Sequence, residues 1–241
     1  MKPKWVAVFD FDGTCLPQKL GSVYNVADSN GALDEKNKLL AQKTRSHFMK
    51  KIEKNSLTSA DSRKWLLDCS KFYINSGLSL KKLEKILWGI ELQDGLVDCF
   101  HYLKEHNIPI TIVSFGLSQF IEVALKANNA HYFVSNIYAA NLIVDANGLI
   151  VGLDPATMVL PGKEKGRFSR LFAKQHNVSC RNILAVGDSF IDAYLGFLRK
   201  NRLGITNSEE KKKILEKYMG EIVVTESFNP VLEWFKRKIE G

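Results

Sequence analysis

The sequence predicts an α/β fold: a three-layer, Rossmann-like parallel sheet core with an inserted helical domain and a small β-hairpin. Three observations lead to this class. Apolar runs typical of buried strands alternate with helical patterns over most of the 241 residues. Residues 17–90 hold helical patterns and no convincing strand. Acidic or small residues follow the apolar runs, as they do where parallel sheets bind ligands.

Five apolar runs are expected to form the strands of the sheet. The first covers residues 6–9, and the second covers 108–113, with its proline near the start, where a strand tolerates one. The remaining three are residues 183–186, 203–205 and 222–224. Helical patterns accompany them at about residues 117–128, 166–176, 190–200, 208–219 and 228–238. This alternation favours parallel strands joined by crossover helices.

The insertion is expected to be a bundle of helices. Its helical patterns cover residues 33–52, 60–74 and 80–87, with turn signals between them. Residues 139–152 have the alternating pattern and Gly-containing loop of a β-hairpin. We therefore expect a core domain of residues 1–16 and 91–241, and a separate helical domain of residues 17–90.

Composition limits the partners that the chain is expected to have. An apolar content of 45% is enough for a packed core, and no apolar run approaches the roughly 18 residues of a membrane span. The net charge of +8 could attract phosphorylated small molecules or nucleic acid, but the lysine runs are more typical of solvated helix faces. No recognised nucleic-acid module is present, so that role is the weakest alternative. The four scattered cysteines form no CxxC pair, which favours reduced thiols in the cytoplasm.

Asp10 and Asp12 follow the first apolar run and are the most informative residues of the chain. Because side chains alternate along a strand, the two carboxylates are expected on one side where the strand ends. Their repulsion and desolvation call for a cation, and an all-oxygen site of this kind suits Mg²⁺. Asp10 is also placed to attack a phosphoryl group, with Asp12 as the acid/base. The alternative is that two aspartates simply end a strand at a turn.

Three further strand and helix junctions carry candidate site residues. Ser114-Phe115-Gly116 offers a hydroxyl and free N–H groups at a helix start, which suit an anion, although Ser also caps helices routinely. Asp188 and Asp192 could both face a cation, or they could belong to a capped helix with an acidic first turn. Lys163 or Lys165 could reach a phosphate or balance the aspartates, and Lys163 could equally be a solvated surface residue.

Taken in order, Asp-x-Asp-Gly-Thr, a strand-end Ser, a Lys and Gly-Asp-x-x-x-Asp resemble the haloacid dehalogenase-like (HAD) superfamily of phosphohydrolases. The resemblance implies a Mg²⁺-dependent phosphomonoester hydrolase that works through an aspartyl-phosphate. It assigns the nucleophile to Asp10 and the acid/base to Asp12. It also assigns phosphate binding to Ser114, with the Phe115-Gly116 segment and the Gly116 amide beside it.

The same resemblance supplies the remaining roles. Lys165 matches the lysine of the superfamily, because its offset to Asp188 and the Gly that follows it are similar to the phosphoserine phosphatase branch. Asp188 matches a direct Mg²⁺ ligand, and Asp192 matches a second ligand or a residue just behind the metal. The main-chain carbonyl of Asp12 is implied as a further ligand. An insertion at residues 17–90 corresponds to a helical, C1-type cap that closes over the site and reads the leaving group.

The cap carries a second, partial resemblance. Residues 22–29 resemble the Tyr-Asn-x-x-Asp-x-Ser segment of cytosolic pyrimidine 5'-nucleotidases, and Ile52-Glu53 is similar to an Ile-Glu whose Glu contacts the nucleoside. No matching aromatic pair is evident, and we interpret Trp65, Phe72 and Tyr73 as core of the cap. The hairpin resembles phosphoserine phosphatases, but no acidic residue follows the Asp motif to meet an amino group.

We therefore expect a small phosphorylated metabolite as substrate, with a nucleoside 5'-monophosphate as the leading choice. The alternatives are another small phosphate ester such as phosphoserine, phosphate transfer to an acceptor alcohol, and an inactive scaffold. The oligomeric state cannot be read from the sequence.

Overall fold

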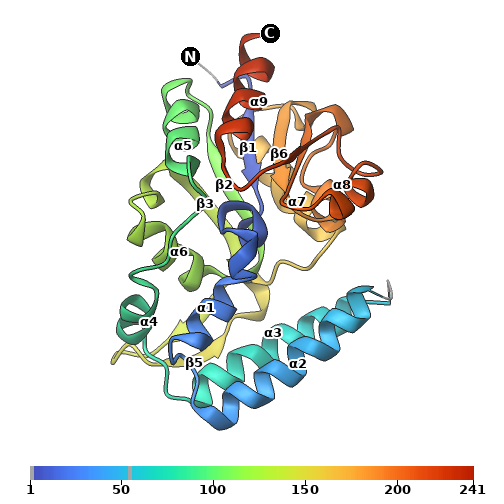
Figure 1. The fold of residues 1–241 in the computed structure, drawn as a ribbon. Coiled ribbons are helices and arrows are strands. Elements are labelled where there is room, and N and C mark those ends of the chain that lie inside the picture. The colour runs from blue at the N-terminus through green and yellow to red at the C-terminus, as the bar shows by residue number, and fades with distance from the viewer. Residues whose placement is uncertain (1–2, 54–55) are drawn as a thin grey trace.

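The computed structural model describes residues 3–53 and 56–241, with the backbone alone at residue 53 (Figure 1). It has the predicted α/β fold. A six-stranded parallel sheet has the order β3-β2-β1-β6-β7-β8. The strands are β1 (Val6–Phe9), β2 (Ile110–Leu117), β3 (Val134–Ala140), β6 (Ile183–Gly187), β7 (Arg202–Thr206) and β8 (Glu221–Val224).

Helices cover both faces of the sheet, which gives the predicted three layers (Figure 1). They are α5 (Leu96–Glu105), α6 (Ser118–Ala127), α7 (Lys163–Gln175), α8 (Glu209–Leu215) and α9 (Asn229–Glu240). Side chains alternate along β1, so they pack into two separate hydrophobic cores, one on each face of the sheet. Phe9 packs on Phe100 of α5 and Phe235 of α9, with ring centroids 5.1 and 5.6 Å away. Val8 belongs to the other core, with Phe172 of α7. A buried central strand therefore has apolar side chains on both faces.

The insertion forms helices α1 (Val23–Ser29), α2 (Glu35–Glu53), α3 (Ser59–Asn75) and α4 (Leu80–Leu87). Figure 1 shows α2 and α3 side by side, beyond the end of the sheet at which β1 finishes. The predicted hairpin, β4 (Leu142–Val144) and β5 (Ile150–Leu153), is antiparallel and attaches to the insertion. Ile150 N donates to Leu78 O at 3.0 Å, and Leu80 N donates to Gly148 O at 2.9 Å. The division of the chain into two domains stays a prediction.

The predicted elements differ from the structure in three places. Strand β3 and helix α5 were not expected; β3 is an edge strand and carries the polar pair Ser135-Asn136. Strand β2 starts two residues later than predicted and continues through residues 114–117. Residues 190–200 are not an α-helix but short 3₁₀ turns, Phe190–Tyr194 and Arg199–Asn201. Arg202 Nε donates to the Gly196 carbonyl at 2.9 Å, so that carbonyl is used outside any helix.

The structure also bears on two expectations for the chain as a whole. Its cysteines are free thiols, with Cys15, Cys69 and Cys99 buried and Cys180 half-buried. Within residues 3–53 and 56–241, no helix is both long enough and apolar enough to cross a bilayer.

Candidate active site

Asp10 and Asp12 lie in a tight turn that leaves the sheet at the end of β1. The strand ends at Phe9, so the turn, rather than the alternation of a strand, brings the two side chains together. Asp12 Oδ1 accepts a hydrogen bond from Val23 N at 2.8 Å, which ties the turn to the start of α1. Gly13 has a φ of 78° and lies so close to Asp188 that a Cβ there would collide with its carboxylate. Glycine is therefore needed both for the turn and for the approach of Asp188.

The neighbouring strand β6 delivers the next two carboxylates. Phe9 is paired with Val186, and Asp10 N donates to Val186 O at 3.0 Å, so Asp188 leaves the sheet beside Asp10. Asp192 lies in the following 3₁₀ turn, where its Oδ2 accepts from Ser189 N at 3.0 Å and from Ser189 Oγ at 2.6 Å. Carboxylate oxygens of Asp10, Asp188 and Asp192 lie within 4.8 Å of one another.

Lys165 is the cation at the centre of this cluster. It lies in the first turn of α7, and its Nζ is 2.5 Å from Asp10 Oδ1 and 2.6 Å from Asp192 Oδ1. Its side chain is buried, whereas Lys163 on the same helix is exposed. A Cβ at Gly166 would collide with the main-chain carbonyl of Tyr194, so the glycine lets α7 approach the turn that holds Asp192.

The carboxylates repel one another, and burial of their charges adds to the effect on their pKa values. Burial, then the charge of Asp192, raises the pKa of Asp10 to about 7 against the opposing effect of Lys165. Burial also raises the pKa of Asp12 to about 6, although the hydrogen bond from Val23 opposes it. Burial, Asp192 and Asp10 raise the pKa of Asp188 well above its usual range. Burial alone would lower the pKa of Lys165, but Asp10 and Asp192 outweigh it and raise that pKa.

The donor set fits a hard divalent cation. The carboxylates of Asp10, Asp188 and Asp192 lie close together, and Lys165 forms ion pairs with two of them, Asp10 and Asp192. Asp12 lines the same pocket, so the carboxylates outnumber this ammonium group and the cluster carries excess negative charge. Only oxygen atoms are offered, which are the ligands that Mg²⁺ prefers. The closest oxygens, from Asp10, Asp188 and Asp192, come from two strand ends that are held in register by the sheet. These residues could therefore hold Mg²⁺.

Ser114, Phe115 and Gly116 belong to strand β2 and not, as predicted, to a helix start. Helix α6 begins at Ser118. The pairing of β2 with β3 shifts register between Val113 and Leu117, so this part of the strand is irregular. Ser114 is buried, and a Cβ at Gly116 would come within 3.1 Å of its Oγ. Ser114 and Phe115 line the same pocket as the aspartates and Lys165, which keeps the Ser114 hydroxyl available for a phosphate.

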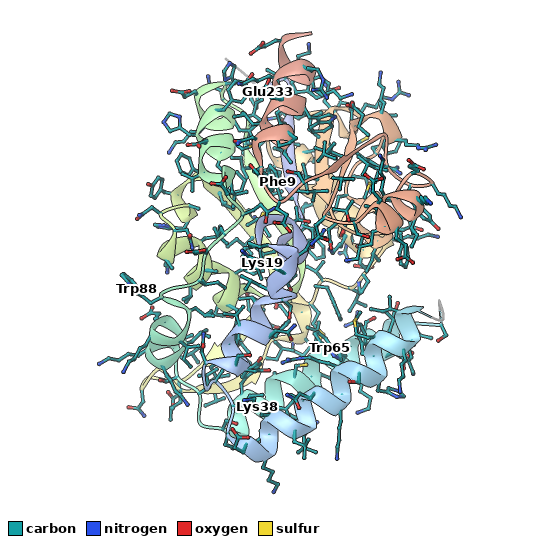
Figure 2. The ribbon with its side chains drawn as sticks, in the orientation of Figure 1. Phe9, Lys19, Lys38, Trp65, Trp88 and Glu233 are labelled. Carbon is teal, nitrogen blue, oxygen red and sulfur yellow. The ribbon has the colours of Figure 1, made fainter. Side chains whose placement is uncertain are left out.

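An aromatic wall above the carboxylates was not predicted. Trp65 of α3, Phe48 of α2 and Phe115 of β2 pack against one another in a cluster of three rings. The ring centroid of Trp65 lies 4.9 Å from that of Phe48 and 5.0 Å from that of Phe115, and those of Phe48 and Phe115 are 5.6 Å apart. Figure 2 shows Trp65 on the side of α3 that faces the core. All three rings line the pocket. Trp65 and Tyr73 are both buried in the core, as expected, and Trp65 is a pocket residue as well.

Other pocket residues were missed as well. Tyr24 and Arg45 line it, and their helical spacing cannot be told from that of ordinary core or surface positions. The resemblance of residues 22–29 to a segment of pyrimidine 5'-nucleotidases was the signal that pointed to α1. The side chain of Glu53, the predicted nucleoside contact at the end of α2, lies outside the described part of the structure. Its role stays a prediction.

Residues 13–227 match the family model described as pyrimidine 5'-nucleotidase (UMPH-1). The chain belongs to this family. The match begins just after Asp12 and includes the cap, Ser114, Lys165, Asp188 and Asp192. It confirms the predicted resemblance to haloacid dehalogenase-like phosphohydrolases and places the chain in a family of phosphoric monoester hydrolases.

Individual relatives point the same way. The phosphoserine phosphatase of Archaeoglobus fulgidus is 26% identical over 213 residues, 88% of this chain, and this chain spans about half (55%) of that relative's length. The structure of cytosolic 5'-nucleotidase IIIB bound to cytidine has a TM-score of 0.72 at 18% identity, covering 98% of this chain and 87% of that one. A phospho-aspartyl intermediate analogue of phosphoserine phosphatase has a TM-score of 0.67 at 19% identity, covering 97% and 99%. Both structures share the fold of this chain.

Proposed function

We propose that this chain is a Mg²⁺-dependent phosphomonoester hydrolase that acts through an aspartyl-phosphate on a small phosphorylated metabolite. The observation that carries the proposal is the position of Lys165 Nζ, at 2.5 Å from Asp10 and 2.6 Å from Asp192, beside the carboxylate of Asp188. A nucleophilic carboxylate, a balancing lysine and an acidic cation site thus lie together at one end of the sheet. Family membership supports the same reaction class.

Asp10 is the nucleophile in this proposal. Its carboxylate attacks the phosphorus atom while the bond to the leaving oxygen breaks, and Asp12 donates a proton to that oxygen. Asp12 is held for this task by the hydrogen bond from Val23 N at 2.8 Å. Asp12 then takes a proton from a water molecule that attacks the aspartyl-phosphate, which releases phosphate and restores Asp10. Lys165 favours the ionised form of Asp10 against burial and the charge of Asp192, and the Ser114 hydroxyl binds the phosphate.

The metal-binding residues of the proposal are Asp10, Asp188 and the main-chain carbonyl of Asp12, with Asp192 as a further ligand or behind them. Bound Mg²⁺ would supply positive charge against the phosphoryl oxygens, which is the main demand of phosphoryl transfer. The excess of buried carboxylates over Lys165 supports this assignment.

A nucleoside 5'-monophosphate is the substrate that the pocket favours. The cluster of Phe48, Trp65 and Phe115 gives the pocket an aromatic, apolar wall beside the carboxylates, which suits an aromatic leaving group. A relative of the same fold was solved with cytidine. A phosphoserine-like substrate is the second candidate, because of the curated phosphoserine phosphatase relative. The aromatic wall weighs against it.

Phosphate release from a panel of phosphomonoesters with Mg²⁺ tests the proposal. The panel holds pyrimidine and purine nucleoside monophosphates, phosphoserine, a sugar phosphate and phenyl phosphate, each with the wild-type protein and with Asp10→Asn. We expect release that is greatest with a nucleotide and absent with the variant. Equal activity of the Asp10→Asn protein would remove the mechanism, and no release from any ester would favour phosphate transfer or an inactive scaffold. Phosphoserine as the best substrate would replace the nucleotide assignment.

A further inference from the structure

Arg45 of α2 lines the active-site pocket and has most of its hydrogen-bonding groups engaged. Its guanidinium forms an ion pair with Asp28 of α1, and Nη1 donates to Asn25 Oδ1 at 3.0 Å. The guanidinium also lies over the Tyr24 ring, 5.7 Å from the centroid. Asp28 in turn accepts from Tyr73 Oη at 3.1 Å. The side chain of Arg45 is 17% exposed and that of Asp28 7%, so the pair is largely withdrawn from water.

Three hydrogen-bond donors in the wall of this pocket have no partner among the described residues. They are Arg45 Nε, Trp65 Nε1 and Tyr24 Oη, and each of these atoms is buried. An unpartnered buried donor costs about 1–3 kcal/mol, so a protein rarely retains several of them in one place without a use. Because all three residues line the pocket, acceptor atoms of a bound ligand are candidate partners for these donors.

The charges of the wall limit what that ligand can be. The positive charge of Arg45 is already balanced by Asp28, so its free Nε–H is a hydrogen-bond donor and not a spare cation. A carboxylate or second phosphate on the leaving group would lack a counter-charge there and would face the carboxylates of Asp10 and Asp12. An ammonium group beside Arg45 would meet a like charge, and neither Arg45 Nε nor Trp65 Nε1 can accept a hydrogen bond from it. The wall is therefore complementary to uncharged groups that carry acceptors, such as ring carbonyls.

We propose that Arg45 is a specificity-determining residue that selects a flat, uncharged, acceptor-bearing leaving group through its Nε–H, together with Trp65 and Tyr24. The inference rests on the proposed phosphomonoesterase function and adds the part of the cap that reads the substrate. It also separates the two substrate candidates, because phosphoserine carries both a carboxylate and an ammonium group, whereas a uracil ring carries two neutral carbonyls.

Steady-state kinetics with two substrates tests the inference. Uridine 5'-monophosphate has an acceptor-rich leaving group, and phenyl phosphate has a flat one without ring acceptors. Arg45→Lys keeps the charge toward Asp28 but removes the Nε–H, and Arg45→Met removes both. Lys43→Met, at an exposed position of the same helix, is the matched control. For Arg45→Lys we expect a KM for uridine 5'-monophosphate about tenfold higher with kcat little changed, the worth of one buried hydrogen bond.

The outcomes separate recognition from structure. With phenyl phosphate, Arg45→Lys is expected to stay within twofold of the wild-type kcat/KM. If Arg45→Lys instead keeps the wild-type kcat/KM for both substrates while Arg45→Met loses activity toward both, Arg45 serves only to hold the structure and the inference is wrong. A wild-type protein that hydrolyses phenyl phosphate at least as well as the nucleotide overturns the inference but leaves the phosphatase function standing. Hydrolysis of neither ester overturns both.

Discussion

At the scale of single residues, the sequence singles out the acidic residues and the lysine that the structure brings together, but not the residues that surround them in the pocket. Asp10, Asp12 and Asp188 follow buried strands, and Asp12 and Asp188 each stand next to a glycine. Acidic residues placed so close together at strand ends have few purely structural uses. Arg45 and Phe48 carry no such mark, because an Arg or Phe on an amphipathic helix is common everywhere. Their place in the pocket depends on how α2 lies against the core, which no local pattern records.

The choice between Lys163 and Lys165 gives the first prediction. Lys165→Met removes the ammonium group that bonds both Asp10 and Asp192, so phosphate release is expected to fall by about 100-fold or more. Lys163→Met, two residues away on the exposed side of the same turn, is expected to stay within twofold. Initial rates with phenyl phosphate measure both. A loss with Lys163→Met and not with Lys165→Met would reverse the assignment.

Gly187 gives the second prediction, because its backbone lies directly against the Asp192 side chain. A Cβ at this position would overlap the Asp192 side chain, so Gly187→Ala is expected to displace that carboxylate from Lys165. We expect phosphate release to fall by at least about tenfold, since small shifts of positioned groups are costly in catalysis. Gly89→Ala, where a Cβ meets nothing within 4 Å, is the control. Wild-type rates from Gly187→Ala would show that Asp192 need not hold its present position.

At the scale of elements, strands buried on both faces were predictable and exposed or irregular ones were not. Residues 6–9 and 183–186 are apolar throughout because helices cover both of their faces. Strand β3 lies at an edge and keeps polar residues, so its pattern is broken. Residues 190–200 have helical spacing but form short turns. The Asp192 carboxylate accepts a hydrogen bond from Ser189 N, and the Gly196 carbonyl accepts one from the Arg202 side chain, so these groups are bonded outside an α-helix.

The start of α3 gives a prediction on pH. Thr58 and Asp61 form a capping box, and Lys51 of α2 bonds Asp61 Oδ1 at 2.5 Å. The hydrogen bond from Lys51, followed by those of Thr58, lowers the pKa of Asp61 to about 2 from 3.8. A lowered pKa means that the ionised form stabilises the fold above about pH 4, and that this contribution is lost as the pH falls toward 2.

Thermal unfolding of Asp61→Ala measures this effect. The variant is expected to have a Tm a few degrees below the wild-type value at pH 6, and the gap is expected to narrow between pH 4 and pH 3. Glu84→Ala is the control, since Glu84 is exposed on α4 and forms no hydrogen bond or ion pair with any described residue. A gap that stays constant down to pH 3 would mean that the ionised Asp61 does not stabilise the α2–α3 pair.

At the scale of the whole molecule, the site exists only where the sheet and the insertion meet. The order of the motifs along the chain predicts that the strand ends gather, because parallel strands finish at one edge. It does not predict that Trp65 of α3 stacks on Phe115 of β2, which depends on the packing of two distant segments. The gathering of the candidate site residues was therefore predictable from the sequence, and the shape of the pocket was not.

Because the candidate metal ligands come from different strands, metal binding is expected to affect the stability of the whole fold. Asp10 and Asp188 leave neighbouring strands, so a cation between them would link β1 to β6, and their mutual repulsion without it opposes folding. We expect saturating Mg²⁺ to raise the wild-type Tm by about 5 °C or more, as preferential binding to the folded state requires. Asp188→Asn removes one repelling charge and one ligand. Its Tm without metal is expected to be no lower than the wild-type value, while its response to Mg²⁺ largely disappears.

Differential scanning calorimetry with and without Mg²⁺ measures this directly and needs no turnover. Glu210→Gln, which removes an exposed carboxylate from α8, is expected to respond to Mg²⁺ as the wild-type protein does. An undiminished Mg²⁺ response of Asp188→Asn would place the metal away from this cluster, whatever the activity measurements show. A low Tm of Asp188→Asn without metal would instead mean that Asp188 supports the fold through its charge. Without metal, Asp188→Asn relieves repulsion and should not lower the Tm; with Mg²⁺, it removes a ligand and should lose the gain in Tm. The Tm of this variant in the two conditions therefore distinguishes a metal ligand from a carboxylate that only supports the fold.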